Sequence, residues 1–87
     1  MKYSLKFEGT AVKQLSKLDN SVKQMLKKWI EKNLIDTENP RQHGKALVGD
    51  KSGYWRYRVG DYRIIADIRD DELLIIAVSI AHRREVY

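Results

Sequence analysis

The chain has 87 residues, of which 43% are hydrophobic and 33% charged, and it contains no cysteine. A chain this short builds one hydrophobic core, so we expect a single domain spanning residues 1–87. The lack of cysteine excludes a disulfide framework and a thiolate metal site, and it indicates a reducing compartment. No apolar stretch is long enough to span a membrane, and the first five residues lack the hydrophobic segment of a signal peptide. These features predict a cytoplasmic protein that does not act at a membrane.

The net charge of +5 is unevenly distributed along the chain. Residues 1–35 hold eight Lys and three acidic residues, whereas residues 53–87 hold six Arg and six acidic residues. Lysine is a flexible point charge, while arginine presents a planar fork that binds phosphate through two hydrogen bonds. Contact with a polyanion is one interpretation of both groups, and a solvated, solubilising lysine surface is the other.

The first half of the chain predicts one strand and two helices. Residues 3–7 alternate apolar and polar side chains, as a half-buried strand does. Thr10 is a candidate N-cap for a helix that ends at about Leu18. Apolar residues then recur three or four apart from Val22 to Leu34, which predicts a second, amphipathic helix of roughly fourteen residues. The short connection favours an antiparallel helical hairpin whose joined apolar faces need a sheet to cover.

The second half predicts a loop and three strands. Residues 36–53 contain the single proline and three glycines, and predict a loop with a short element at residues 45–47. Residues 54–59 and 62–69 flank Gly60-Asp61, a two-residue hairpin turn of type II′. Residues 73–80 are almost continuously aliphatic, which favours a central strand buried on both faces. The order β-α-α-β-β-β predicts an α+β fold, with the helical hairpin packed on a small antiparallel sheet that the first strand joins.

Arginines gather on one face of the predicted hairpin. The two-residue turn fixes the register and pairs Arg58 with Arg63, with Arg56 on the same face. Two like charges directly opposite each other destabilise a sheet by up to about 1 kcal/mol unless an anion compensates. A local rule that is broken in this way tends to mark a functional site. The alternative is that Asp67 and Glu85 neutralise the arginines in surface ion pairs.

The last six residues add further polar groups next to the end of the central strand. They include His82, Arg83, Arg84 and Tyr87. We expect Arg83 and Tyr87 to fold over the arginines and complete a polar pocket, although a solvated chain end is the alternative. His82 has no second histidine or carboxylate at ligand spacing, so we expect no metal and no other cofactor.

This set of residue types suits cleavage of RNA. The neighbouring 2′-hydroxyl attacks the phosphate, so the protein has to align that attack, stabilise the charged phosphorane and move two protons. Guanidinium groups stabilise the charge, but arginine is not a general base because its pKa exceeds about 12.

The element order, the segment Gly53–Ile65 and the ending His82–Tyr87 resemble the RelE-type toxins of bacterial toxin–antitoxin systems, over essentially the whole chain. The resemblance implies a microbial-RNase-like fold and a metal-independent endoribonuclease that cleaves mRNA in the ribosomal 30S A site and inhibits translation. It also implies neutralisation by a cognate RelB-like antitoxin, an apolar groove for an antitoxin helix, and binding of operator DNA only through the antitoxin complex.

The resemblance also assigns roles to individual residues. Arg56 and Arg58 occupy the positions of two catalytic lysines in the family, Arg63 and Arg83 match catalytic arginines, and Tyr87 matches a stacking and catalytic tyrosine. Because arginine replaces lysine here, the proton of the 2′-hydroxyl goes to Tyr87 or His82, or the ribosome organises the mRNA so that no strong protein base is needed. The cations expected to contact RNA and the ribosome are Lys13, Lys17, Lys23, Lys27, Lys28 and Arg84.

Two other functions are compatible with the same architecture. The first is inhibition of DNA gyrase by a ParE-type toxin, which binds a protein and has no nuclease site. The second is RNA or protein binding by a toxin homologue that has lost catalysis, which the replaced lysines permit. The arginine cluster and the ending His82–Tyr87 argue against the gyrase inhibitor.

Overall fold

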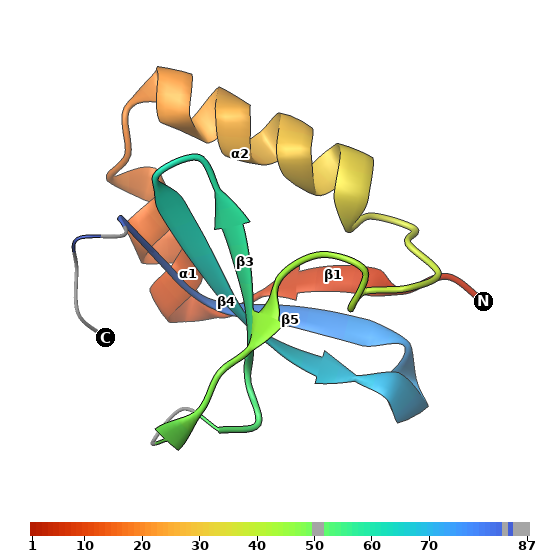
Figure 1. Ribbon diagram of the computed structural model, residues 1–87. Helices are drawn as coiled ribbons and strands as arrows, with labels where there is room; N and C mark the ends of the chain where they lie inside the picture. Colours follow the sequence, from red (N-terminus) through yellow and green to blue (C-terminus); the bar gives the residue numbers. More distant parts are fainter. Residues whose placement is uncertain (50–51, 83, 85–87) are drawn as a thin grey trace.

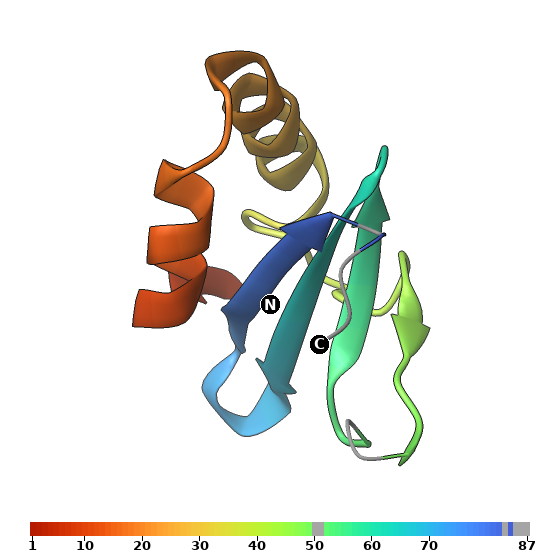
Figure 2. The same ribbon diagram turned by 90° about the vertical axis from the view of Figure 1, so that its left-hand side faces the viewer.

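A computed structural model describes residues 1–49, 52–82 and 84 (Figure 1). Five strands form one sheet in the order β1-β5-β4-β3-β2, in which β1 is parallel to β5 and the other neighbours are antiparallel. Both helices cover the same face of this sheet, and the other face carries no helix (Figure 2). None of the helices in the described ranges is long and apolar enough to cross a membrane. In chain order the elements are β1 (Ser4–Phe7), α1 (Gly9–Ser16), α2 (Asn20–Asn33), β2 (Lys45–Ala46), β3 (Trp55–Val59), β4 (Tyr62–Arg69), the 3₁₀ helix η2 (Asp70–Glu72) and β5 (Leu74–His82).

The predicted α+β fold is confirmed, with differences at the ends of some elements and in two other features. β1 joins the sheet parallel to β5. β5 is not fully buried on both faces, because no helix covers the second face of the sheet. The helix α1 begins at Gly9 and has Glu8 rather than Thr10 as its N-cap, because the Glu8 N–H still donates to Ala77 O (2.9 Å) and the chain turns into the helix directly after the strand. The three acidic residues between β4 and β5 form the short helix η2, and the predicted short element at residues 45–47 is the edge strand β2. The last strand continues beyond Ile80 because His82 still pairs with Tyr62.

The hairpin between β3 and β4 has the predicted register. Val59 faces Tyr62, and Arg58 faces Arg63. Of the two central turn residues only Gly60 has a positive φ, +59°, as a type II′ turn requires. The turn chemistry therefore determines which side chains of both strands share a face.

The hydrophobic core lies between the helices and the helix-covered face of the sheet. Its fully buried side chains include Leu26 of α2, Ile64 of β4 and Ile75 of β5. Tyr57 is fully buried as well, and its hydroxyl donates to Pro40 O at 2.6 Å, which satisfies the buried phenol. Burial raises the pKa of Tyr57, so this phenol stays neutral and serves the core and the loop rather than proton transfer.

An ion-pair network fastens the loop after α2 to the far end of the sheet. The Arg41 guanidinium donates to both carboxylate oxygens of Asp70 (2.9 and 3.1 Å), and the Tyr3 hydroxyl donates to Asp70 Oδ1 at 2.6 Å. Hydrogen bonds from Arg41 and Tyr3 lower the pKa of Asp70. The network joins three segments that are remote in sequence, and so fixes the start of the loop that leads to β2.

A bulge in β5 shifts the register of its pairing with β4. The register passes from Ile65 opposite Ser79 to Ala66 opposite Ala77, so β5 contains one extra residue at this point. Next to it, the Ile80 N–H donates to the Gln14 side-chain oxygen of α1 at 2.6 Å. Because Ser79 pairs with Ile65, it lies on the same face as Arg63, which is two residues before Ile65 on β4.

Candidate functional site

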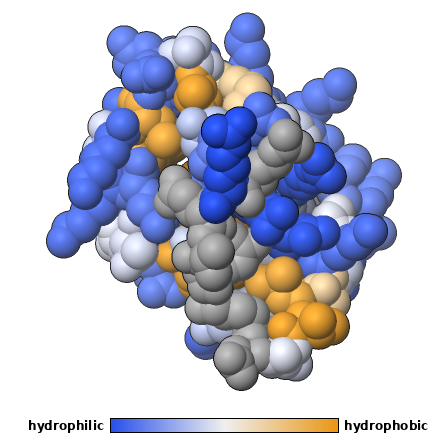
Figure 3. Space-filling view, turned by 60° about the vertical axis from the view of Figure 1, so that its left-hand side comes forward, coloured by the Kyte–Doolittle hydropathy of each residue, from blue (hydrophilic) through white to orange (hydrophobic). Residues whose placement is uncertain are grey.

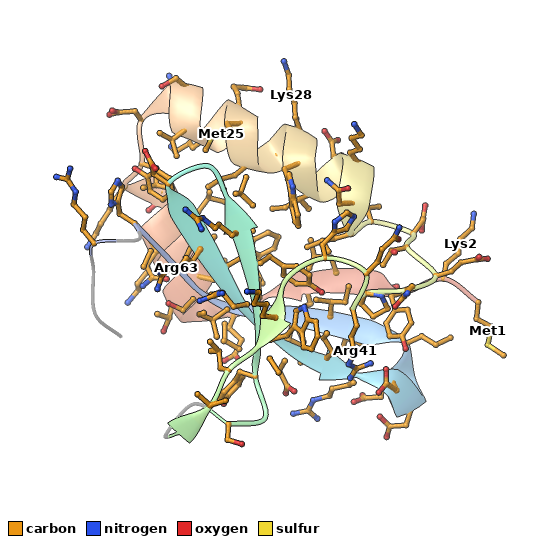
Figure 4. The ribbon with its side chains drawn as sticks, in the orientation of Figure 1. Met1, Lys2, Met25, Lys28, Arg41 and Arg63 are labelled. Atoms are coloured by element: carbon orange, nitrogen blue, oxygen red, sulfur yellow. The ribbon has the colours of Figure 1, made fainter. Side chains whose placement is uncertain are left out.

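Three arginines lie together on the sheet face that the helices leave uncovered. Arg56 and Arg58 are two residues apart on β3, and Arg63 of β4 is the direct cross-strand partner of Arg58. Directly opposite residues on one face have Cβ atoms about 5 Å apart, which is within reach for two guanidiniums that bind one phosphate group. We call these three residues the arginine face. Figure 4 shows Arg63 near the hairpin, and hydrophilic side chains dominate the surface in Figure 3.

The predicted neutralisation by Asp67 does not occur at the two β3 arginines. Asp67 accepts a hydrogen bond from Arg69 at 3.1 Å instead. Within the described ranges Arg58 is exposed and forms no ion pair, and the Arg56 Nε is buried with no hydrogen-bond partner. A buried donor without an acceptor is costly, so it points to a ligand that accepts this hydrogen bond. Glu85, the other expected counter-ion, lies outside the described residues.

The structure adds one cation that the sequence did not indicate. Lys45 of β2 is the cross-strand partner of Arg56, and directly paired residues project from the same face. Lys45 is exposed and forms no ion pair within the described ranges. The short strand β2 has no periodicity of its own, so nothing in the sequence alone indicated this pairing.

Of the predicted site residues near the C-terminus, the structure describes His82 and Arg84. His82 pairs with Tyr62, and their rings meet edge to face with centroids 5.1 Å apart. Because Tyr62 alternates with Arg63 along β4, His82 lies on the helix-covered face and not beside the arginines. Arg84 is exposed, and its backbone N–H donates to His82 Nδ1 at 3.2 Å. Arg83 and Tyr87 lie outside the described residues.

The predicted lysines are carried by the two helices. Lys13 lies in α1 and Lys17 caps its C-terminal end, and both are exposed. The other three lie on α2, where Lys28 points away from the sheet and Met25 faces the hairpin (Figure 4). None of the five has an ion-pair partner in the part of the chain that the structure describes. The three lysines of α2 are Lys23, Lys27 and Lys28.

A separate apolar groove lies between β1, α1 and α2. It has a volume of about 540 Å³. Leu5 and Phe7 of β1 form its floor, and Ile35, which is 45% exposed, lines it after the end of α2. Lys23 and Lys27 also line it, so two of the predicted RNA-binding lysines stand beside an unfilled apolar surface.

The arrangement of the arginine face is suited to one kind of chemistry. It offers several guanidiniums to a phosphate group, and none of the ion pairs among the described residues involves Arg56 or Arg58. In the described part of the chain no three His, Asp or Glu side chains are grouped so that they would hold a metal ion. An arrangement of this kind is suited to holding a phosphate group through hydrogen bonds and charge.

Comparison with known proteins identifies the class of protein to which this fold and this basic face belong. Residues 5–87 match the family described as ParE toxin of the type II toxin–antitoxin system, parDE. The chain therefore belongs to the RelE/ParE superfamily of type II toxins. It is 31% identical over 90 residues to the mRNA interferase toxin RelE of Escherichia coli K12, an alignment that covers 100% of this chain and 92% of that protein. It is also 26% identical to toxin RelG of Mycobacterium tuberculosis, with 100% and 98% covered.

Solved structures agree with this assignment. The toxin–antitoxin complex RelBE2 of M. tuberculosis matches with a TM-score of 0.85 and 25% identity, over 98% of this chain and 95% of the matched chain. The intact RelBE complex of E. coli matches with a TM-score of 0.75 and 25% identity, over 95% and 99%. The predicted RelE-type resemblance is thus confirmed at the level of fold and superfamily.

Proposed function

We propose that this protein is a ribosome-dependent endoribonuclease that cleaves mRNA in the 30S A site and thereby inhibits translation in the cytoplasm. The observation that carries the proposal is the arginine face, where Arg56 and Arg58 have no carboxylate partner among the described residues and a buried Nε lacks an acceptor. The similarity to RelE of E. coli, whose name is mRNA interferase, supports the same activity.

In the proposed reaction the 2′-hydroxyl of the mRNA attacks the adjacent phosphorus and the bond to the 5′-oxygen breaks. The products are a 2′,3′-cyclic phosphate and a free 5′-hydroxyl. The arginine face stabilises the phosphorane dianion that forms on the way, and Arg83 adds a further guanidinium. Because the reacting groups belong to the RNA, no external nucleophile and no metal ligand set is required.

Two protons must also move, one from the 2′-hydroxyl and one to the leaving oxygen. Arginine does not accept the first proton, since its pKa exceeds about 12. His82 packs edge to face on Tyr62 at the other face of the sheet, which favours Tyr87 over His82 as the group that takes it. We therefore assign acceptance of the 2′-hydroxyl proton to Tyr87 and phosphate binding to the arginines, and the leaving 5′-oxygen takes its proton from water.

The lysines of both helices serve to dock the toxin on ribosomal RNA. Exposed lysines attract a phosphate backbone without regard to sequence, and this attraction falls with salt. Charge reversal at Lys13, Lys17 and Lys27 is expected to weaken association by at least tenfold, on the scale of several lost phosphate contacts. Co-sedimentation with ribosomes measures the effect, and an unchanged thermal transition shows that the fold is kept. Unaltered co-sedimentation of the triple variant contradicts this docking role.

The groove between β1, α1 and α2 is the proposed site for an amphipathic helix of the RelB-like antitoxin. Its apolar floor suits such a helix, and the charged residues that also line it, Lys23, Lys27, Glu31 and Asp36, offer ion pairs to polar flanks of the partner. Toxin–antitoxin complexes among the similar structures support an antitoxin as the partner. Operator DNA is then contacted through the antitoxin in the joint complex.

Ile35→Glu is expected to weaken antitoxin binding by at least tenfold, because it puts a carboxylate on the apolar wall of the groove. Val12→Glu is the matched control, since Val12 is a 52% exposed aliphatic residue that does not line the groove. Isothermal titration calorimetry with the cognate antitoxin measures the affinity of each variant. Equal affinities of both variants would place the antitoxin elsewhere.

The second candidate function is inhibition of DNA gyrase, which the ParE description of the matching family favours. One comparison separates the two candidates. Purified protein is added to programmed ribosomes, to ribosome-free mRNA and to a gyrase supercoiling reaction. The proposed function predicts cleavage in the ribosome reaction alone. Loss of supercoiling without any mRNA cleavage would establish the gyrase inhibitor instead.

A further inference from the structure

Lys45 extends the arginine face across a third strand. Its Cα pairs with that of Arg56, whose other cross-strand partner is Ile65. Adjacent strands lie about 4.8 Å apart, so the Lys45 stem starts one strand spacing from that of Arg56. The basic surface therefore runs across β4, β3 and β2 as two adjacent pairs of like charges, Arg58 with Arg63 and Arg56 with Lys45.

The position of Lys45 is fixed by its neighbours and not by the short strand alone. Gly44 has a φ of +87°, and a Cβ placed there would lie 2.1 Å from Arg56 O, so the two strands approach closely at this point. The Trp55 Nε1 donates to His43 O at 2.6 Å, which holds the segment that precedes β2. These contacts hold the two-residue strand β2 against β3, so the backbone of Lys45 has its position before any ligand binds.

Like charges directly opposite each other destabilise a sheet, and no acidic side chain within the described ranges pairs with Lys45 or Arg56. The Lys45–Arg56 pair lies beside the exposed Arg58 on one open face, and this arrangement indicates a polyanionic ligand that crosses from strand to strand. The guanidiniums around Arg58 suffice for a single phosphate, whereas Lys45 stands at the far end of the surface. A chain of phosphates uses both ends.

We propose that Lys45 is a positioning residue that binds a backbone phosphate of the RNA strand next to the phosphate held by the arginine face. The inference rests on the proposed function for the identity of the RNA as mRNA. Lys45 forms its contact equally in the bound state and in the transition state. It therefore sets the affinity and the register of the RNA strand, and leaves the chemical step to the arginines.

The first experiment measures binding without catalysis. Fluorescence anisotropy follows a short single-stranded 2′-O-methyl RNA, which has no free 2′-hydroxyl, as salt is raised. Loss of one phosphate contact lowers the slope of log K against log salt by about 0.7 for single strands. Lys45→Ala is expected to show this loss, whereas Lys45→Arg keeps the slope. Lys2→Ala is the matched control, because Lys2 is an exposed lysine near the N-terminus, away from Arg63 (Figure 4).

The second experiment is single-turnover cleavage on programmed ribosomes. For Lys45→Ala we expect the half-saturating toxin concentration to rise by about five- to tenfold, in line with a lost charge-assisted contact, with the maximal rate changed less than about twofold. A lower maximal rate with unchanged half-saturation would overturn the positioning role, as would a salt slope equal to that of Lys2→Ala. If the wild-type protein does not cleave but the slope still falls in Lys45→Ala, the RNA contact stands and the nuclease function fails.

Discussion

Arg58→Ala is expected to lower the rate of mRNA cleavage on programmed ribosomes by about 10²- to 10³-fold, the usual effect of removing one preorganised donor from a charged transition state. Arg58 is exposed, has no ion pair among the described residues and faces Arg63 directly. Its removal breaks no ion pair among the described residues, so we expect the free energy of unfolding to change by less than about 0.5 kcal/mol. Quench-flow cleavage and thermal unfolding measure the two effects.

The matched control is Arg69→Ala. Arg69, on β4, is also an exposed arginine, but it forms ion pairs with Asp67 and Glu72 at 3.1 and 3.5 Å. We expect it to leave cleavage unchanged. Arg58→Lys keeps the charge but loses the planar fork, and it should retain more activity than alanine. Equal cleavage rates in the Arg58 and Arg69 alanine variants would contradict the catalytic role of the arginine face.

Gly44→Ala is expected to destabilise the fold by about 3 kcal/mol, the sum of strain at positive φ and overpacking. Its φ is +87°, and the new Cβ would lie 2.1 Å from the backbone oxygen of Arg56, which cannot yield as a flexible side chain does. β2 must then move away from β3. Urea denaturation measures the change in the free energy of unfolding.

Gly49→Ala separates the two causes. Gly49 also has a positive φ, +71°, but a Cβ there meets nothing within 4 Å. The strain remains while the collision is absent, so we expect a loss of only about 1 kcal/mol. Equal losses in both variants would mean that the close approach of β2 to β3 does not contribute to stability.

The arginine face was predictable because its causes are local. Gly60-Asp61 demands a two-residue turn, the turn fixes the register, and the period of two then sorts arginines from apolar residues. The length of α2 was predictable for the same reason. Its apolar residues recur with the period of a helix, and Leu26 and Ile30 among them face the core. Each of these inferences needed only residues that are near one another in the chain.

The parts that escaped prediction depend on contacts between remote segments. The two residues of β2 carry no periodicity, so the pairing of Lys45 with Arg56 appears only once the sheet is assembled. The network of Tyr3, Arg41 and Asp70 joins residues up to 67 positions apart. His82 was expected in a polar tail, but pairing with Tyr62 extends the strand and places the imidazole on the other face.

Single-turnover cleavage of an A-site codon on programmed ribosomes, with two mRNAs compared side by side, decides whether the protein is a nuclease that uses the 2′-hydroxyl of its substrate. One mRNA is all-ribose, and the other carries a single 2′-deoxy nucleotide immediately 5′ of the scissile phosphate. We expect a cut in the first that ends in a 2′,3′-cyclic phosphate, no cut in the second, and no cut in either without ribosomes. An intact all-ribose mRNA, or cleavage of both mRNAs at the same rate, would contradict this expectation.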